Sequence, residues 1–394
     1  MDRPRARDLG ISIGRMTPGP RNAISDVEGV RVGHATIVRG EGPLVVGEGP
    51  VRTGVTVVLP HGGDVWTQPV FAGCHRLNGN GELTGLEWIR ESGLLGGGVG
   101  ITNTHSVGVV RDALVGHAAR RHPGSDGFWS LPVVGETYDG ALNDIDGFHV
   151  TASHVDAAVA DAEASEGRVR EGDVGGGTGM ICHEFKGGIG TASRRLTEAQ
   201  GGWTLGVLVQ ANYGHRALLR IDGVPVGAEI PTSEVPSPWD QFEELRARDA
   251  SRPRHARAGT DGGSIIVLVA TDAPLLPHQC TRLAQRPSLG LGRMGSFASH
   301  GSGDLFLAWS TANRGLGWPE DEAGPSLTVD VRSVAGAAID PLFEATAEAT
   351  EEAVVNALLA AETMTGRDGI TAAAIDPDRV RDILAGHGAI AAAG

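Results

Sequence analysis

One serine in this chain lies where a flexible glycine pair changes into a buried strand. Asp261-Gly262-Gly263-Ser264 leads directly into the apolar run from Ile265 to Asp272, and a β-branched run of this kind is typical of a buried strand. Cleavage of the Gly263-Ser264 bond would give Ser264 a free α-amine beside its nucleophilic hydroxyl, and that amine could act as the base. The competing interpretation is structural, because serine is common at strand starts and Gly-Gly is common in loops.

Three more polar side chains lie beside apolar runs. Ser302 and Asp304 come just before the run at 305–310, and their spacing of two places them on one face of an extended chain. A hydroxyl and a carboxylate in this arrangement can relay a proton or orient a nucleophile. Asn212 ends another apolar run and could donate to an oxyanion. The competing interpretations are a capped turn for the pair and an ordinary turn residue for Asn212.

Glu136 and Tyr138 repeat the same alternation within the segment Gly135 to Asp144. A carboxylate could receive the free ammonium group of a substrate, and a phenol could polarise a carbonyl. A solvated turn is the competing interpretation of this segment.

The elements that would position these residues are short strands and a few helices. Besides the run after Ser264, apolar runs predict strands at 30–33, 54–60, 97–103, 204–210 and 305–310. Helical spacing and end signals predict helices at 86–91, 151–164 and 340–364. Because strands and helices do not alternate strictly, the pattern favours a layered α+β fold, an α/β/β/α sandwich, over a doubly wound sheet.

The segment 236–263 is polar, charged and rich in proline and glycine, and it ends at the candidate scissile bond. We interpret it as an exposed linker that delivers this bond to solvent. An ordinary surface loop is the alternative.

Cofactor and metal signatures are weak. The glycine clusters at 79–85, 96–100 and 175–179 do not give a P-loop or a dinucleotide-binding pattern. The histidines are scattered, and His183-Glu184 does not extend to H-E-x-x-H. Three widely spaced cysteines argue against a disulfide scaffold and a zinc ribbon. We therefore expect no cofactor and no metal.

Charge and hydropathy limit the partners. The 394 residues carry a formal net charge of −15, and the 33 Lys and Arg form no long basic block, so nucleic acid and anionic membrane surfaces are not expected partners. No stretch approaches the roughly 20 apolar residues that span a bilayer. A charged start without a long apolar core argues against a signal peptide, and we expect a cytoplasmic protein.

Six motifs, in order along nearly the whole chain, resemble the DmpA-like family of N-terminal-nucleophile aminopeptidases, peptidase family S58, which includes L-aminopeptidase/D-amino-acid esterases and β-peptidyl aminopeptidases. The motifs lie at 22–34, 77–85, 102–108, 135–138, 210–214 and 263–274. The resemblance implies a four-layer α/β/β/α sandwich of the DmpA/ArgJ-like type and a precursor that cuts itself before its nucleophile. Residues 1–263 and 264–394 would become an α chain and a β chain within one structural domain.

The resemblance also implies roles for individual residues. Ser264 would be the nucleophile, activated by the Ser302 and Asp304 pair, although some relatives carry the longer Glu where this chain has Asp304. Asn212 would donate to the oxyanion, Glu136 would receive the free amine of the substrate, and Tyr138 with Trp129 would line the pocket. Substrates would be small peptides or amino-acid amides or esters, and the processed pairs would form a homo-oligomer.

The chemistry leaves two questions open. Either the α-amine of Ser264 or the Ser302 and Asp304 pair could be the base. The alternatives to a self-processing aminopeptidase are an unprocessed, non-catalytic binding protein of the same fold and an acyltransferase of related architecture. The sequences of such acyltransferases resemble a pattern in which threonine is the nucleophile, and Ser264 does not fit that pattern.

Overall fold

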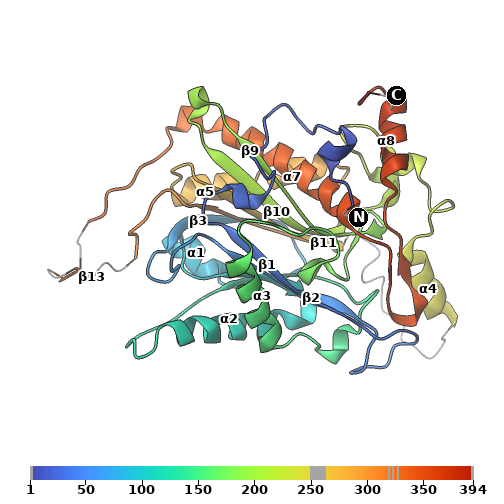
Figure 1. The fold of residues 1–394 in the computed structure, drawn as a ribbon, viewed down its shortest axis with the longest axis horizontal. Helices are drawn as coiled ribbons and strands as arrows, with labels where there is room; N and C mark the ends of the chain where they lie inside the picture. The colour runs from blue at the N-terminus through green and yellow to red at the C-terminus, as the bar shows by residue number, and fades with distance from the viewer. Residues whose placement is uncertain (1–2, 249–262, 318–319, 322–323, 326–327, 392–394) are drawn as a thin grey trace.

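Two β-sheets lie face to face between two layers of helices (Figure 1). The structure, a computed structural model, describes residues 3–248, 263–317, 320–321, 324–325 and 328–391. The four layers are α/β/β/α, which confirms the sandwich expected from the sequence. No helix in the described part of the chain is both long and apolar enough to cross a membrane.

The smaller sheet has four strands in the order β1-β2-β5-β6. They are β1 (Arg31–Arg39), β2 (Val51–Leu59), β5 (Val99–Asn103) and β6 (Val133–Thr137). Strands β5 and β6 are parallel, and helix α2 (Val107–Arg121) connects them. Helix α3 (Ala152–Ala164) packs so closely on β1 that a Cβ on Gly33 would lie 2.1 Å from the backbone nitrogen of Ala162. Glycine therefore permits this contact.

The larger sheet has six strands in the order β4-β3-β12-β11-β10-β9. They are β3 (Val70–Gly79), β4 (Leu94–Leu95), β9 (Gly188–Arg195), β10 (Thr204–Tyr213), β11 (Gly263–Thr271) and β12 (Gly303–Ser310). Strands β11 and β12 are parallel, and the chain between them forms α5 (Pro277–Ala284) and α6 (Pro287–Arg293). Strands β10 and β12 are buried at every position, because helices cover one face and the other sheet covers the second.

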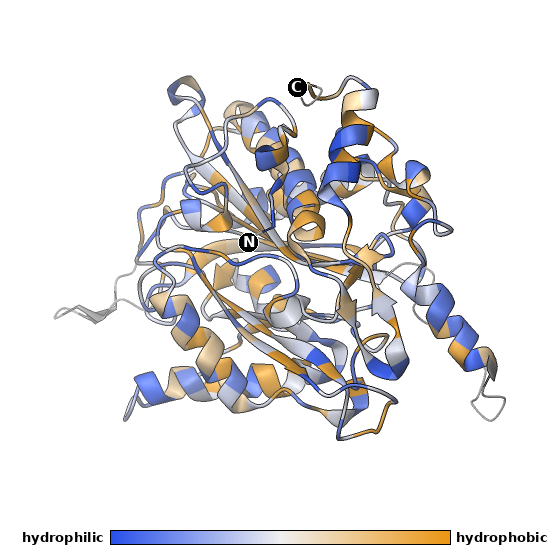
Figure 2. Cartoon of the chain, turned by 45° about the vertical axis from the view of Figure 1, so that its right-hand side comes forward, coloured by the Kyte–Doolittle hydropathy of each residue, from blue (hydrophilic) through white to orange (hydrophobic). Residues whose placement is uncertain are grey.

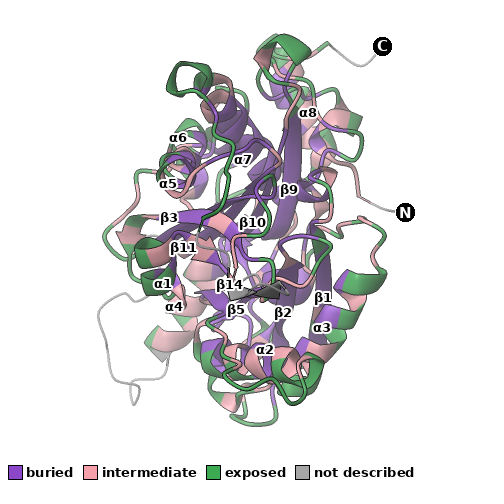
Figure 3. Ribbon diagram, turned by 90° about the vertical axis from the view of Figure 1, so that its left-hand side faces the viewer, coloured by how far each residue is buried: buried purple, intermediate pink, exposed green. Residues whose placement is uncertain are grey.

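Apolar side chains fill the spaces between the layers. Val58, Ile101, Leu208, Ile266 and Leu268 belong to the cluster between the two sheets. Two further clusters join each sheet to its helices. The sheets are buried, whereas helices α2 and α3 show exposed faces (Figure 3), and hydrophilic and hydrophobic residues alternate along the helices (Figure 2). The burial pattern agrees with amphipathic helices that cover a two-sheet core.

Helix α7 (Asp340–Ala360) is the longest helix among the described residues and lies across β9 and β10. It begins with Pro341 near its N-terminus, as predicted, and it ends four residues earlier than the expected limit at 364. The remaining elements are α1 (Leu86–Ser92), α4 (Pro238–Arg248), α8 (Pro377–Gly386), β7 (Ile181–Cys182), β8 (Phe185–Lys186), β13 (Glu320–Asp321), β14 (Gly324–Pro325), β15 (Met364–Thr365) and β16 (Thr371–Ala372).

The expected linker at 236–263 begins with a helix. In α4, Trp239, Phe242 and Leu245 pack against a small buried cluster that includes Leu142 and Ile370. Residues 249–262 lie outside the described residues, so the part of the expected linker nearest the candidate scissile bond is not described. Strand β11 begins at Gly263.

Candidate active site

Ser264 is the second residue of β11, between two neighbouring strands that carry other candidate residues. It pairs with Asn212 of β10 on one side and with Gly303 of β12 on the other. Its side chain is buried, and Oγ accepts a hydrogen bond of 3.2 Å from the backbone N–H of Gly303. Sheet register therefore brings three segments that are distant in sequence to one serine hydroxyl.

Gly263, directly before this serine, adopts a conformation that favours glycine. Its φ is +57°, and a Cβ at this position would lie 1.9 Å from the backbone oxygen of Asn212. A larger residue would therefore clash with β10 as well as strain the backbone. The glycine allows the chain to enter β11 with Ser264 against its neighbours.

Ser302 and Asp304 form a buried pair at the start of β12. The hydroxyl of Ser302 donates a hydrogen bond of 2.7 Å to Oδ2 of Asp304, and both residues are about 2 % exposed. Burial raises the pKa of the Asp304 carboxyl to about 6, although the hydrogen bond from Ser302 opposes this shift. The carboxylate is therefore a stronger proton acceptor than an exposed aspartate.

Asn212 has both ends of its side-chain amide engaged. Oδ1 accepts a hydrogen bond of 2.8 Å from the backbone N–H of Ile181, and Nδ2 donates one of 3.0 Å to the backbone oxygen of Tyr138. The first contact fixes which end of the amide is the donor. The donor in turn contacts the segment that carries Glu136 and Tyr138.

Glu136 approaches the larger sheet from β6 of the smaller one. Its Oε2 accepts a hydrogen bond of 2.5 Å from the hydroxyl of Thr104, and its Oε1 accepts one of 3.1 Å from the backbone N–H of Glu82. Burial raises the pKa of this carboxyl. A Cβ on Gly81 would lie 2.9 Å from Oε1 and 3.3 Å from Cα of Gly303. Only one glycine thus separates Glu136 from the start of β12.

Tyr138 is half-buried, and burial raises the pKa of its phenol. Next to it, Asp139 is completely buried and accepts hydrogen bonds from the amides of Asn103 and Asn143, 3.0 and 3.1 Å long. Burial raises the pKa of the Asp139 carboxyl to about 6. Sequence reasoning missed Asp139, although it lies in the segment singled out for Glu136 and Tyr138.

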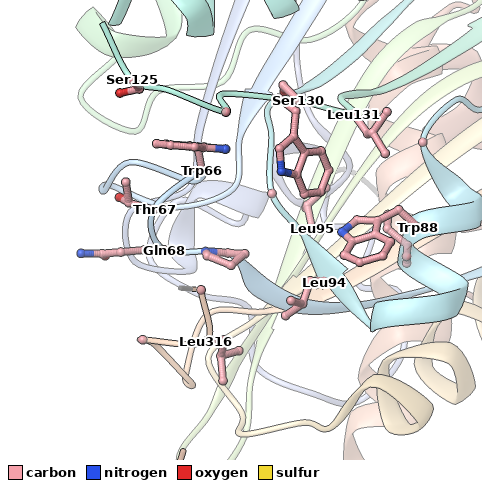
Figure 4. Close-up of a pocket in the computed structure, with 18 of the residues that line it drawn as sticks. Trp66, Thr67, Gln68, Trp88, Leu94, Leu95, Ser125, Ser130, Leu131 and Leu316 are labelled. Carbon is pink, nitrogen blue, oxygen red and sulfur yellow. The ribbon is translucent and has the colours of Figure 1, made fainter. Parts of the chain in front are cut away.

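Trp129 lies in a different place. Its ring contacts that of Trp88 edge to face at 5.6 Å between centroids. Both line a cavity of about 1290 Å³, together with Trp66, Leu94 and Leu316 (Figure 4). None of the other six candidate side chains lines this cavity. The structure places Asn212 and Gly303 beside Ser264, Ser302 and Asp304 on either side of Gly303, and Glu136 near the same strand end. Tyr138 meets this group only through its backbone oxygen, which accepts from Asn212, and Trp129 lies in a separate apolar hollow.

The described residues contain no group of three or more histidine, cysteine or acidic side chains arranged to hold a metal ion. The side chains of Ser264, Ser302, Asp304, Asn212 and Glu136 can supply a hydroxyl nucleophile, a hydroxyl and carboxylate relay, an amide donor and a buried carboxylate. These are the groups that acyl transfer from a substrate with a free amine requires.

Comparison with known proteins gives one consistent result. Residues 22–372 match the model of Peptidase family S58. A beta-peptidyl aminopeptidase, BapA, of Sphingosinicella microcystinivorans is 47 % identical over 391 residues, which cover 99 % of this chain and 94 % of the relative.

Two solved structures share the fold along nearly their whole length. A Burkholderia sp. beta-aminopeptidase is 50 % identical, with a TM-score of 0.86 over 99 % of this chain and 100 % of the other. An L-aminopeptidase D-Ala-esterase/amidase from Ochrobactrum anthropi, described as a prototype of the serine aminopeptidases with a variant of the Ntn hydrolase fold, is 44 % identical. Its TM-score is 0.85 over 98 % of this chain and 100 % of its own.

Proposed function

The chain belongs to peptidase family S58 and is an aminopeptidase of the N-terminal-nucleophile class, and we propose that it cuts itself between Gly263 and Ser264 and then uses Ser264 as its nucleophile. The observation that carries this proposal is the position of Ser264. Its hydroxyl lies at a strand start, after a left-handed glycine, next to the strand that begins with the Ser302 and Asp304 pair.

In self-cleavage, Oγ of Ser264 attacks the carbonyl carbon of Gly263. The C–N bond breaks, the acyl group moves from nitrogen to oxygen, and the nitrogen of Ser264 takes a proton to become a free amine. Water then hydrolyses the ester, which leaves a carboxylate on Gly263 and restores the hydroxyl. The products are residues 1–263 and 264–394, which remain in one domain because β11 pairs with β10 across the cut.

The base for self-cleavage must be a group that exists before the cut. The nitrogen of Ser264 is still part of a peptide bond at that stage, and its lone pair is delocalised into the carbonyl, so it cannot act as the base. Ser302 and Asp304 lie on either side of Gly303, whose backbone N–H donates to Oγ of Ser264, and the raised pKa of Asp304 suits a base that acts near neutral pH. We assign the proton of Ser264 to this pair in the first reaction.

In turnover, Ser264 attacks the carbonyl of the first residue of the substrate, and the leaving amine departs from an acyl-enzyme that water hydrolyses. The new α-amine now lies on the nucleophile itself and titrates near pH 8 when unperturbed, so it takes the proton in this reaction. Asn212 stabilises the oxyanion once its amide leaves the carbonyl of Tyr138. Glu136 receives the free amine of the substrate, and Tyr138 lies beside it.

The substrates are small peptides or amino-acid amides or esters with a free amine. Support comes from the buried carboxylate of Glu136 and from the relatives, which are described as beta-peptidyl aminopeptidases and as an L-aminopeptidase D-Ala-esterase/amidase.

The processed pairs form a homo-oligomer, and this part of the proposal rests on the family resemblance alone. Cys74, Cys182 and Cys280 are free and buried, which fits the reducing cytoplasm.

The test compares four proteins on one amino-acid p-nitroanilide. Wild type should hydrolyse the free-amine compound, and the same compound with a blocked amine should react at least about 10²-fold more slowly. Ser264→Ala should be uncut and inactive, and Glu136→Gln should lose the preference for a free amine. Ser333→Ala, a serine far from the site in sequence, is the matched control and should behave as wild type.

Equal rates on blocked and free amines would remove Glu136 from its role, and an inactive wild type that binds the compound would favour the binding-protein alternative.

A further inference from the structure

Asn78, at the end of β3, contacts the hydroxyl of Ser302. Its Nδ2 lies 3.0 Å from Oγ of Ser302, 2.5 Å from the backbone oxygen of Ser299 and 3.4 Å from that of His300. Asn78 belongs to the motif at 77–85, to which the mechanism above gives no role. Strand pairing places it directly opposite Asp304.

The neighbours of Asn78 fix the direction of its hydrogen bond to Ser302. Backbone oxygens of Ser299 and His300 can only accept, so the amide nitrogen must face them and the amide donates to Oγ of Ser302 as well. A hydroxyl has one hydrogen and two lone pairs. With one lone pair taken by Asn78, its hydrogen is free for Asp304, and the second lone pair is left for another donor.

We infer that Asn78 is a positioning residue that holds the Ser302 hydroxyl in one direction, with its hydrogen on Asp304 and its remaining lone pair open, so that the Ser302 and Asp304 pair is ready to take a proton. The inference rests on the proposed function of Ser264. Without the amide, the Ser302 hydroxyl loses its fixed direction. Its hydrogen bond to Asp304, which lowers the pKa of that carboxyl, then weakens.

Asn78 belongs to a short segment, residues 78–82, that also contacts Glu136. We call residues 78–82 the strap. At its start the strap donates from Asn78 to Ser302, and the backbone N–H of Asn80 donates to the backbone oxygen of Ser302, 3.0 Å away. At its end the backbone N–H of Glu82 donates to Oε1 of Glu136. The strap thus connects the relay to the proposed amine-binding carboxylate, which explains why an asparagine and closely packed glycines occur together here.

The experiment measures self-cleavage against pH. Full-length chains made by cell-free synthesis are held between pH 5 and 8, and the fraction cut is followed by intact mass. Asn78→Ala should slow self-cleavage by about 10²-fold. The acid limb of its pH–rate profile, where the rate falls as the pH drops, should move to higher pH, because a weaker hydrogen bond from Ser302 raises the pKa of Asp304. In the fraction that does mature, kcat on a free-amine p-nitroanilide should fall while KM stays constant, since Asn78 does not touch substrate.

Asn80→Ala is the matched control. It removes the same amide from the same strap, but that amide contacts only the backbone oxygen of Gly301 at 2.8 Å, so the acid limb should stay in place. Asn78→Leu keeps a similar shape without the donor or an added charge, and it serves if Asn78→Ala does not fold. The inference is overturned if a folded Asn78 variant is cut at the wild-type rate, or if it slows without moving the acid limb. If wild type itself is never cut, the proposed function fails instead.

Discussion

Two groups of buried acids in this molecule are held in opposite ways. On the outer face of the larger sheet, Arg194 of β9 lies 2.9 Å from Oε2 of Glu348 and 2.8 Å from Oε2 of Glu352, both on α7. Arg7 adds a second guanidinium at 2.8 Å from Glu352. These carboxylates are buried but neutralised, and they join β9, α7 and the N-terminal segment.

The acids of the candidate active site have no such partner. Within the described residues no ion pair involves Glu136, Asp139 or Asp304, and only hydroxyl and N–H groups donate to them. Burial raises the pKa of all three. The first group therefore serves stability, whereas the second keeps carboxylates that can exchange a proton near neutral pH and lowers the stability of the fold.

The largest expected effect is on the arginine-paired group. Arg194→Met leaves buried Glu348 without a guanidinium and Glu352 with only that of Arg7, and we expect a loss of about 3–5 kcal/mol in the free energy of unfolding. Urea titration in the uncut Ser264→Ala background measures it on a single chain. Arg120→Met breaks the exposed pair with Asp156 and should lose no more than about 1 kcal/mol. Equal losses in both variants would show that the arginine-paired group stabilises the fold no more than an exposed ion pair does.

The second prediction concerns an acid of the active site. In the same uncut background, Asp304→Asn should increase stability at pH 7.5 by about 1–3 kcal/mol, since a carboxyl whose pKa rises from 3.8 to about 6 disfavours the folded state once it is charged. The penalty is absent below the unfolded pKa and complete above the folded one, so the two proteins should be equally stable at about pH 3. With Ser264 restored, Asp304→Asn should slow self-cleavage by about 10²–10⁴-fold. A variant less stable at pH 7.5 would contradict this account.

The third prediction separates the two bases by pH. Self-cleavage should fall as the pH drops through about 6, because protonated Asp304 can no longer draw the proton of Ser302. Turnover by the mature enzyme should fall at a higher pH, nearer the ordinary titration of an α-amine at about 8. The rates of both reactions, measured over one buffer series, give the pH at which each reaction loses half of its rate. If the two pH values coincide, one base serves both reactions.

The smallest expected effect lies outside both groups of acids. Trp129→Ala should leave the rate of self-cleavage within about twofold of wild type, because Trp129 lines a cavity that none of the other six candidate residues lines. A gel time course on cell-free protein checks it. A tenfold slower cut would extend the active site into that cavity, and a change in KM alone would keep Trp129 as a pocket residue.

Much of the fold could be predicted from local sequence. The apolar runs at 54–60, 204–210 and 305–310 are strands, and the helical spacing after Pro341 is a helix. Helices such as α2 and α5 were missed, because their apolar positions are few or interrupted by polar residues. Helix α4 lay inside a segment whose prolines and charges favoured a linker.

The candidate site could be predicted only in part. Ser264, Asn212 and Ser302 each stand out at the end of an apolar run, but their meeting depends on which strands pair, and pairing between distant segments leaves no local signal. Asp139 and Asn78 look like ordinary turn residues in sequence. Only burial and the neighbouring donors and acceptors give them significance.

Self-cleavage before Ser264 is tested most directly by the intact mass of the purified protein under denaturing conditions, for wild type and for Ser264→Ala. We expect wild type to give two species, residues 1–263 and 264–394, with Ser264 at the start of the second, whereas Ser264→Ala should give one full-length species. A single full-length mass for active wild type, or a cut at any other bond, would contradict it.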